Sequence, residues 1–311
     1  MRRFVDLHTH STASDGALAP AELVALADRK RLAALALTDH DTTAGLADAR
    51  AAAKAFPLLR FVPGIEVSAA FPTGTLHILG LGIHDNSAAL ARLAVTLRAA
   101  RDDRNPKIIT KLQSLGLKIS MDDLWHGRPA RGPEAGCRGR GVGGHADTHP
   151  PVLGRLHIAH ALLAKGYVRT LQEAFDRYIG RDAPAFVEKD KLRPRAVLAA
   201  LHAAGGLSVL AHPTQLQYAN SAQLEHIVRD LADAGLDAIE AYHPDHTARQ
   251  TRAYLALAQR FNLGVTGGSD FHGPAKPTVL LGRPKVSVTM LSPALAARLL
   301  GSPAPAEDTA P

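Results

Sequence analysis

The sequence predicts an α/β fold in which short strands alternate with helices around a parallel sheet or barrel. Short apolar segments, such as 32–37 and 207–211, are separated by stretches with the apolar spacing of amphipathic helices. Aromatic residues make up only 5% of the chain, which disfavours an all-β fold. A length of 311 residues suits one large domain carrying a sizeable insertion.

The alternation is visible in both outer portions of the chain. The expected strands are 4–7, 32–37, 59–67, 76–81, 207–211, 238–242 and 264–268. The expected helices between them are 21–29, 43–55, 197–204, 224–234 and 249–261. Pro20 stands directly before the first of these helices, a position that proline favours. Residues 1–87 and 185–300 therefore read as the two halves of one barrel.

The middle of the chain breaks this rhythm. Helical patterns over 90–115, 158–163 and 171–179 have no strands between them, which predicts an inserted helical subdomain over 88–184. Within it, 127–151 is rich in glycine, proline and arginine and lacks periodicity, so a flexible loop is expected there. The tail 301–311 is expected to be disordered.

Composition narrows the functional classes. No apolar run of about 18 residues is present, and the first residues lack the apolar core of a secretory signal, so we expect neither a membrane span nor export. The single cysteine, Cys137, excludes an internal disulfide and fits a cytoplasmic location. A net charge of +7 is compatible with an anionic substrate or with nucleic acid. Nothing points to an obligate protein partner.

Histidine and carboxylate side chains gather where the expected strands end. These residues are His8, His10, His40, Glu66, His77, His212, His243, Asp270 and His272. In a parallel barrel the carboxyl ends of the strands meet at one mouth, where active sites are built. Imidazole nitrogen and carboxylate oxygen are ligands of divalent metals. The pattern therefore predicts a metal site, with His8 and His10 facing the same way from an extended segment.

Several motifs together resemble those of the PHP (polymerase and histidinol phosphatase) family. They are Asp6-Leu7-His8-Thr9-His10-Ser11, Ser14-Asp15-Gly16, Leu37-Thr38-Asp39-His40-Asp41, Gly64-Ile65-Glu66, His77, Ala211-His212-Pro213 and Gly268-Ser269-Asp270-Phe271-His272. The resemblance implies a distorted seven-stranded barrel with a cluster of usually three divalent ions at its mouth. Manganese is the first expectation for the ions, with iron or zinc as alternatives.

The resemblance also implies a ligand set. It assigns His8, His10, Glu66 and Asp270 to one metal, Glu66, His77 and His212 to a second with Glu66 bridging, and Asp15, His40 and His272 to a third. A hydroxide bridging two metals would be the nucleophile. We expect His243 to contact the phosphate or to protonate the leaving oxygen. The alternative is a surface histidine in a loop.

The insert carries a second resemblance. Gly154-Arg155-Leu156-His157-Ile158-Ala159, Gly166-Tyr167-Val168 and Glu173-Ala174-Phe175 are similar to a subgroup of 3′,5′-nucleoside bisphosphate phosphatases and 5′-to-3′ exoribonucleases. Leu156 stands where that subgroup commonly has proline. The resemblance makes Arg155 a bidentate clamp for the phosphate that is not cleaved, assisted by His157. Arg155 paired with a helix carboxylate is the alternative.

These observations predict a phosphomonoesterase that removes the 3′-phosphate of nucleoside 3′,5′-bisphosphates and trims short 5′-phosphorylated RNA from its 5′ end. Histidinol-phosphate phosphatase, or another small phosphomonoesterase, is the nearest alternative, since the barrel motifs do not distinguish them. A non-catalytic metal-binding or nucleic-acid-binding module is the alternative of a different class.

Overall fold

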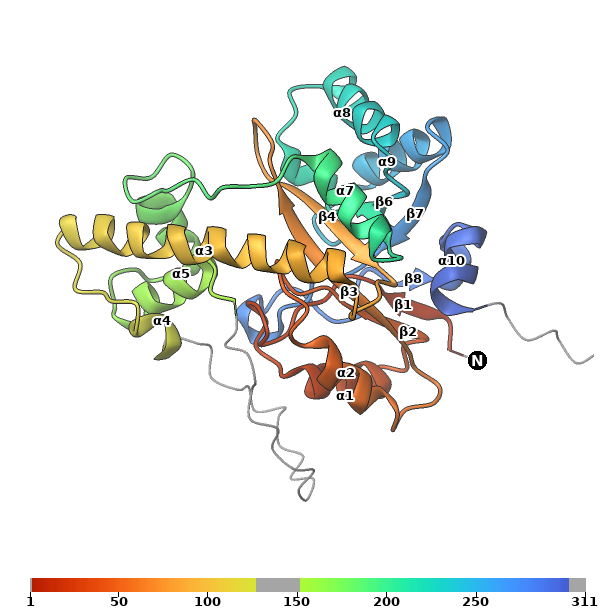
Figure 1. Cartoon of the computed structure of the whole chain (residues 1–311), viewed down its shortest axis with the longest axis horizontal. Helices are drawn as coiled ribbons and strands as arrows, with labels where there is room; N and C mark the ends of the chain where they lie inside the picture. The colour runs from red at the N-terminus through yellow and green to blue at the C-terminus, as the bar shows by residue number, and fades with distance from the viewer. Residues whose placement is uncertain (1, 127–151, 302–311) are drawn as a thin grey trace, which may run out of the picture.

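The computed structural model describes residues 2–126 and 152–301, and they form a nearly closed, barrel-like sheet with helices outside it and a helical insert at one side (Figure 1). The expected flexible loop 127–151 lies outside the described residues, as does the expected disordered tail apart from Gly301. The eight strands are β1 (Phe4–Asp6), β2 (Ala34–Leu37), β3 (Arg60–Ala69), β4 (Leu76–Leu81), β5 (Leu207–Leu210), β6 (Ala238–Tyr242), β7 (Gly264–Gly267) and β8 (Val286–Ser287).

Strand order confirms the barrel and adds two reversals, at β4 within the sheet and at β8, which runs antiparallel to β1. The order is β7-β6-β5-β4-β3-β2-β1-β8, with β1, β2 and β3 mutually parallel and β5, β6 and β7 mutually parallel. β4 runs antiparallel to both of its neighbours. The wholly parallel arrangement expected from the sequence is therefore wrong at β4, which follows β3 through a hairpin rather than a helix. The reversal places His77 at the mouth, because His77 is near the start of β4.

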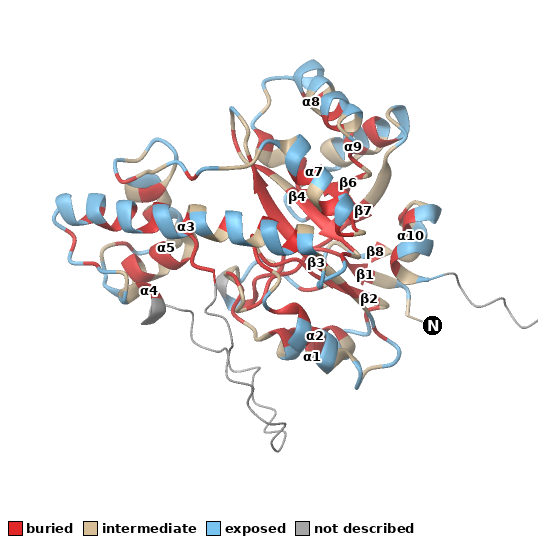
Figure 2. Ribbon diagram, in the orientation of Figure 1, coloured by how far each residue is buried: buried red, intermediate tan, exposed pale blue. Residues whose placement is uncertain are grey.

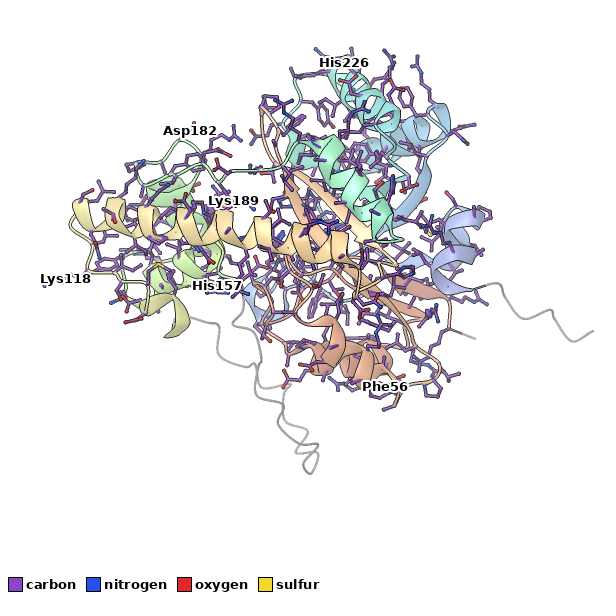
Figure 3. The ribbon with its side chains drawn as sticks, viewed as in Figure 1. Phe56, Lys118, His157, Asp182, Lys189 and His226 are labelled. Atoms are coloured by element: carbon purple, nitrogen blue, oxygen red, sulfur yellow. The ribbon has the colours of Figure 1, made fainter. Side chains whose placement is uncertain are left out.

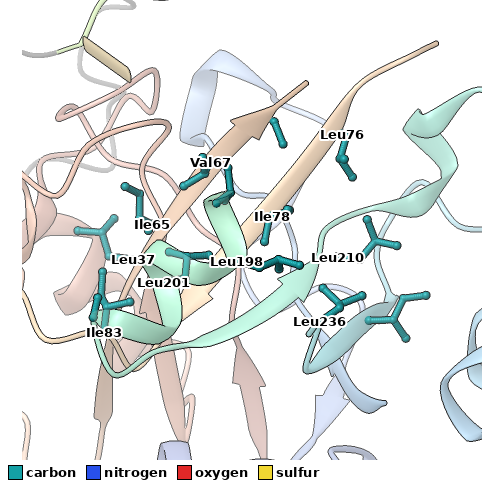
Figure 4. Packing of buried hydrophobic residues seen from close by; sticks show 14 of the residues in the cluster. Leu37, Ile65, Val67, Leu76, Ile78, Ile83, Leu198, Leu201, Leu210 and Leu236 are labelled. Carbon is teal, nitrogen blue, oxygen red and sulfur yellow. The ribbon is translucent and has the colours of Figure 1, made fainter. Parts of the chain in front are cut away.

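Two apolar layers hold the sheet because successive side chains of a strand point to opposite faces. Residues such as Ala36, Val62 and Val209 form one cluster, and Leu37, Ile65 and Leu210 belong to another. Figure 4 shows the second cluster, where Leu198 and Leu201 of α7 (Pro194–Ala203) pack over β3, β4 and β5. Truncating a buried leucine of this kind to alanine costs about 2–5 kcal/mol of stability.

The remaining helices of the barrel cover its outside, with buried faces turned to the sheet and exposed faces turned away (Figure 2). They are α1 (Pro20–Arg29), α2 (Leu46–Ala53), α8 (Ser221–Asp233), α9 (Ala248–Arg260) and α10 (Pro293–Leu300), with short 3₁₀ turns at Pro213–Leu216, Gly273–Ala275 and Val288–Met290. The sequence analysis anticipated neither β8 nor α10.

The insert is built on the long helix α3 (Ala88–Ser114). Leu90, Leu93 and Leu97 near its start belong to the core of the barrel, whereas Ile108 and Leu112 near its end belong to a separate core. That second core also contains residues of α4 (Asp123–His126), α5 (Arg155–Ala164), α6 (Leu171–Ala174) and the π-helix Phe175–Ile179. α5 begins at Arg155, so the leucine at 156 is accommodated in a regular first turn.

In the part of the chain that the structure describes, no helix combines the length and apolarity that a membrane crossing requires.

Candidate metal centre

The strand ends bring the expected metal-binding side chains together at the mouth of the barrel. The described residues form three groups, and within each group the potential ligand atoms lie within 4.8 Å of one another. We call His8, His10, Glu66 and Asp270 the inner group, and His10, Asp15, His40 and His272 the rim group. The third group is His40, Glu66 and His77, and His212 lies beside it with Nε2 2.9 Å from Oε1 of Glu66.

Glu66 stands at the centre of the arrangement and is completely buried on β3. Its Oε1 faces His77 and His212, at 2.7 and 2.9 Å. Its Oε2 faces His8, His10 and His40, at 3.3, 3.2 and 2.9 Å. Although burial acts in the opposite direction, the surrounding imidazoles hold the pKa of Glu66 well below its usual value. A carboxylate whose two oxygens face different sets of imidazoles has the geometry needed to bridge two cations.

The donor set fits divalent metal ions. Buried atoms of the site have no hydrogen-bond partner among the described residues, although other polar atoms surround them. They include His8 Nε2, His10 Nδ1 and Nε2, His40 Nδ1 and Glu66 Oε2. Burying polar groups without partners is costly, so these atoms require a ligand. Buried imidazole and carboxylate groups at this density are consistent with a site for several metal ions.

Glu240 on β6 is a functional residue that the sequence analysis did not assign. Its buried carboxylate lies 3.1 Å from Nδ1 of His8 and accepts a 2.8 Å hydrogen bond from the backbone N–H of His212. A proton held on Nδ1 leaves Nε2 of His8 free to bind a cation. The available signal was a single acidic residue inside the apolar strand 238–242.

The backbone conformation of residues 268–272 places Asp270 in the inner group. Asp270 has a φ of 55°, a conformation that non-glycine residues rarely adopt, and its N–H donates to the carbonyl of His8 at 2.9 Å. A side chain at Gly268 would meet Cβ of His8 at 2.4 Å, so only glycine permits this approach. Oδ1 of Asp270 then lies 3.1 Å from Nε2 of His10, while Oδ2 accepts from Nζ of Lys276 at 2.8 Å.

His243 is buried beside the centre, so it is not the surface histidine of the alternative interpretation. Its Nδ1 accepts a 3.2 Å hydrogen bond from the backbone N–H of Asp245. In the neutral ring the proton therefore resides on Nε2, which lies 3.9 Å from Oδ2 of Asp270 and has no hydrogen-bond partner among the described residues. The ring is arranged to donate a hydrogen bond into the site.

A cationic pocket lies between the insert and the barrel. It is a cavity of about 200 Å³ whose lining includes Arg104, Arg155, Phe186 and Lys189. The guanidinium of Arg155 lies 5.4 Å from the centre of the Phe186 ring. Burial, and then repulsion from other guanidinium groups, lowers the pKa of Arg104 to about 9. Figure 3 shows Lys189 and His157 on the part of the insert nearer the barrel, while Lys118 is at its far end.

Two of the three arginines that line this pocket, Arg104 and Arg155, have no carboxylate partner within 4.0 Å in the described parts of the chain. Arg104 is buried and, among the described residues, donates only to the amide oxygen of Asn105, at 2.8 and 3.2 Å. The nearby Glu188 pairs with Lys191 instead. The pairing of Arg155 with a helix carboxylate, considered above, is therefore not observed. His157 accepts from the backbone N–H of Gly154 at 3.0 Å and so caps its own helix.

A nearly closed barrel with a buried histidine–carboxylate centre at its mouth defines a class of metal-dependent enzymes, and the comparisons identify the family. The model of the PHP domain matches residues 6–237, and the chain belongs to that family. It is a PHP-family phosphoesterase.

Three curated relatives cover most of the chain. A 3′,5′-nucleoside bisphosphate phosphatase of Chromobacterium violaceum is 33% identical over 272 residues, 88% of each chain. A 5′-3′ exoribonuclease of Haemophilus influenzae is 32% identical over 275 residues, 88% of this chain and 92% of the relative. A phosphoribosyl 1,2-cyclic phosphate 1,2-diphosphodiesterase of Eggerthella lenta is 34% identical over 277 residues, 86% and 94%. A solved structure from Bifidobacterium adolescentis gives a TM-score of 0.77 at 29% identity, covering 91% of this chain and 92% of that one.

Proposed function

We propose that the protein removes the 3′-phosphate of nucleoside 3′,5′-bisphosphates and also trims short 5′-phosphorylated RNA from its 5′ end. The observation that carries this proposal is the cationic pocket beside the metal centre. Two arginines without carboxylate partners, one of them buried, call for an anionic ligand. A substrate with one phosphate at the metals and a second in the pocket meets both requirements.

The proposed metal ligands are His8, His10, Glu66 and Asp270 for one ion, Glu66, His77 and His212 for a second, and Asp15, His40 and His272 for a third. When bound, such ions lower the pKa of a water nucleophile and neutralise phosphoryl charge. Mn²⁺ is the proposed metal, and Fe or Zn are the alternatives.

The chain's own residues bind and orient the substrate. Arg155 and Arg104 hold the phosphate that is not cleaved, and a guanidinium fork suits two of its oxygens. His243 directs its Nε2–H towards the reacting phosphate or the leaving oxygen. His157 contributes by fixing the start of α5, which positions the neighbouring Arg155.

The pocket also ranks the alternatives. Histidinol phosphate has one phosphate and a cationic amine, which a pocket of unpaired arginines would repel. The substrate named for the Eggerthella lenta relative, a phosphoribosyl cyclic phosphate, also carries a second phosphate, so the pocket does not separate it from the bisphosphate and the assay must. A nucleic-acid-binding module without metal has no need of Glu240, which orients a metal ligand, and the assay below separates an enzyme from a non-catalytic metal-binding module.

The test is an assay of the wild type and of His8→Ala with Mn²⁺ on adenosine 3′,5′-bisphosphate, 3′-AMP, histidinol phosphate, phosphoribosyl 1,2-cyclic phosphate and 5′-phosphorylated RNA. We expect release of the 3′-phosphate from the bisphosphate to be fastest, and His8→Ala to abolish it. Inactivity of the wild type on every substrate would reject the enzyme, and preference for histidinol phosphate or the cyclic diester would reject the bisphosphate.

A further inference from the structure

The rim group differs from the inner group in exposure. Asp15 and His40 lie outside the named strands, and their side chains are 14% and 16% exposed. The side chains of His8, His10 and Glu66 have no exposure. Loops that carry ligands at an open edge need support from outside to keep their geometry.

The insert supports the loop of His40. The next residue, Asp41, is buried, and its carboxylate accepts from Arg101 of α3 at 2.6 and 2.7 Å and from Lys189 at 2.5 Å. Lys189 lies on the segment 180–192 that returns to α7; we count this segment with the insert, because Ala185 packs in the insert's core. Asp41 also accepts from the backbone N–H of Ser68 at 2.9 Å. A carboxylate with two buried cations from the insert and one bond to β3 joins the metal-bearing loop to both units.

The insert also supports the loop of Asp15. The backbone N–H of Val152 donates to the carbonyl of Ala13 at 3.1 Å. Beside this bond is a cavity of about 20 Å³ lined by Asp15 and by His160 of α5. Nε2 of His160 is buried and has no hydrogen-bond partner among the described residues. A cavity of this size between polar groups suits one ordered water, which would join His160 to the carboxylate of Asp15.

In the part of the chain that the structure describes, the inner group is supported by side chains of the barrel. Glu240 holds His8 and the backbone of His212. Asp6 accepts from the N–H and hydroxyl of Ser269, at 2.9 and 2.6 Å, next to Asp270. None of these supporting side chains belongs to the insert.

We propose that the helical insert sets the affinity of the rim site for its cation, with Arg101, Lys189 and His160 as positioning residues. This rests on the proposed assignment of a third ion to Asp15, His40 and His272. Groups that orient metal ligands typically contribute about 10- to 100-fold in metal affinity. The insert therefore completes a metal site as well as forming the cationic pocket, and the barrel retains the other two ions without it.

A matched pair of variants on α3 tests the proposal. Arg101→Met removes a buried guanidinium that holds Asp41, and Lys189 remains to neutralise that carboxylate. Arg104→Met removes a buried guanidinium one turn away that does not contact Asp41. Bound Mn²⁺ is measured by equilibrium dialysis over a range of concentrations, with circular dichroism as the check on folding.

We expect Arg101→Met to bind one equivalent of Mn²⁺ about 10- to 100-fold more weakly than the wild type, with the other equivalents unchanged. Arg104→Met should match the wild type. Equal Mn²⁺ binding by the wild type and Arg101→Met, or equal weakening of every equivalent, would overturn the proposal. If Arg101→Met does not fold, His160→Ala is the second variant, with the same expected and overturning results.

Metal stoichiometry is independent of substrate choice. A wild type that fails to hydrolyse the bisphosphate would reject the proposed function and leave the Mn²⁺ result to decide the role of the insert. An unchanged rim site in an active enzyme would reject only the role of the insert.

Discussion

The mouth of the barrel and the cationic pocket are adjacent, but their polar groups are arranged on opposite principles. At the mouth, imidazoles and carboxylates crowd together, and Glu66 alone faces five histidines. In the pocket, Arg104 and Arg155 have no carboxylate partner within 4.0 Å among the described residues. The donors at the mouth suit bound cations, whereas the guanidinium groups of the pocket suit a bound anion. The contrast supports our proposal that the barrel supplies the chemistry and the insert supplies the choice of substrate.

The largest expected effect comes from the mouth. His10 is a proposed ligand of the inner ion and also lies among the ligands of the rim group, so His10→Ala removes one donor and disturbs both groups. We expect kcat/KM to fall by at least about 10²–10³-fold, the range for losing a group that stabilises transition-state charge. The loss should be equal on adenosine 3′,5′-bisphosphate and on 3′-AMP. A loss confined to the bisphosphate would break the division between the two regions.

A substitution in the pocket should affect the two substrates differently, in contrast to a substitution at the mouth. Arg155→Ala removes a charge-assisted contact worth about 1.5–3 kcal/mol, which corresponds to about 10- to 150-fold in kcat/KM on the bisphosphate. On 3′-AMP, which lacks the second phosphate, the change should be small. Arg169→Ala, at an exposed site on the same insert, is the control. Equal losses on both substrates would remove the proposed clamp.

Glu240→Gln tests whether a residue of the barrel orients the metal ligand His8. The amide keeps the size of the side chain but weakens its hold on Nδ1 of His8. We expect about 10- to 100-fold weaker Mn²⁺ binding by dialysis, with a matching loss of activity on all substrates. Glu22→Gln, which changes an acid that caps α1 away from the centre, should leave Mn²⁺ binding unchanged. Normal metal binding by Glu240→Gln would show that His8 is oriented by other contacts.

Lys276→Met should have the smallest effect. Its ammonium pairs with Oδ2 of Asp270 at 2.8 Å, but the side chain is 37% exposed. Exposed ion pairs contribute about 0.2–1 kcal/mol, so a change in kcat/KM of about five-fold or less is expected. Assays on both substrates check it, and a loss far above this range would mean that Lys276 touches the phosphate.

The sequence was most informative where function depends on a motif at a strand end. The His8–His10 pair, Glu66 and the Asp270–His272 pair follow recognisable strands, and the fold brings them together. The direction of β4 was not readable, because an apolar strand has the same alternation in either direction. β8 has only two residues and leaves no pattern.

The contacts that support the metal ligands could not be predicted from the sequence, for a different reason. Glu240 lies 232 positions from His8, and Lys189 lies 148 positions from Asp41. Each contact depends on how distant segments pack against each other. The hydrophobic periodicity of a single segment carries no information about such packing. Arg101 and Arg104 look alike in a charged helix, yet one is neutralised by a carboxylate and the other is not.

The reversed direction of β4 determines how far the insert must travel. β4 starts at the mouth and carries the chain to the opposite end of the barrel, so α3 must run back along the wall before it can reach the metal centre. Its 27 residues span about 40 Å, and they deliver Arg101 and Arg104 to the mouth after roughly half that length. The length of α3 therefore sets both the position and the orientation of the insert. Removing one residue from α3 would rotate the part of the insert that follows by about 100°. Only deletions close to whole turns should keep the pocket facing the metals.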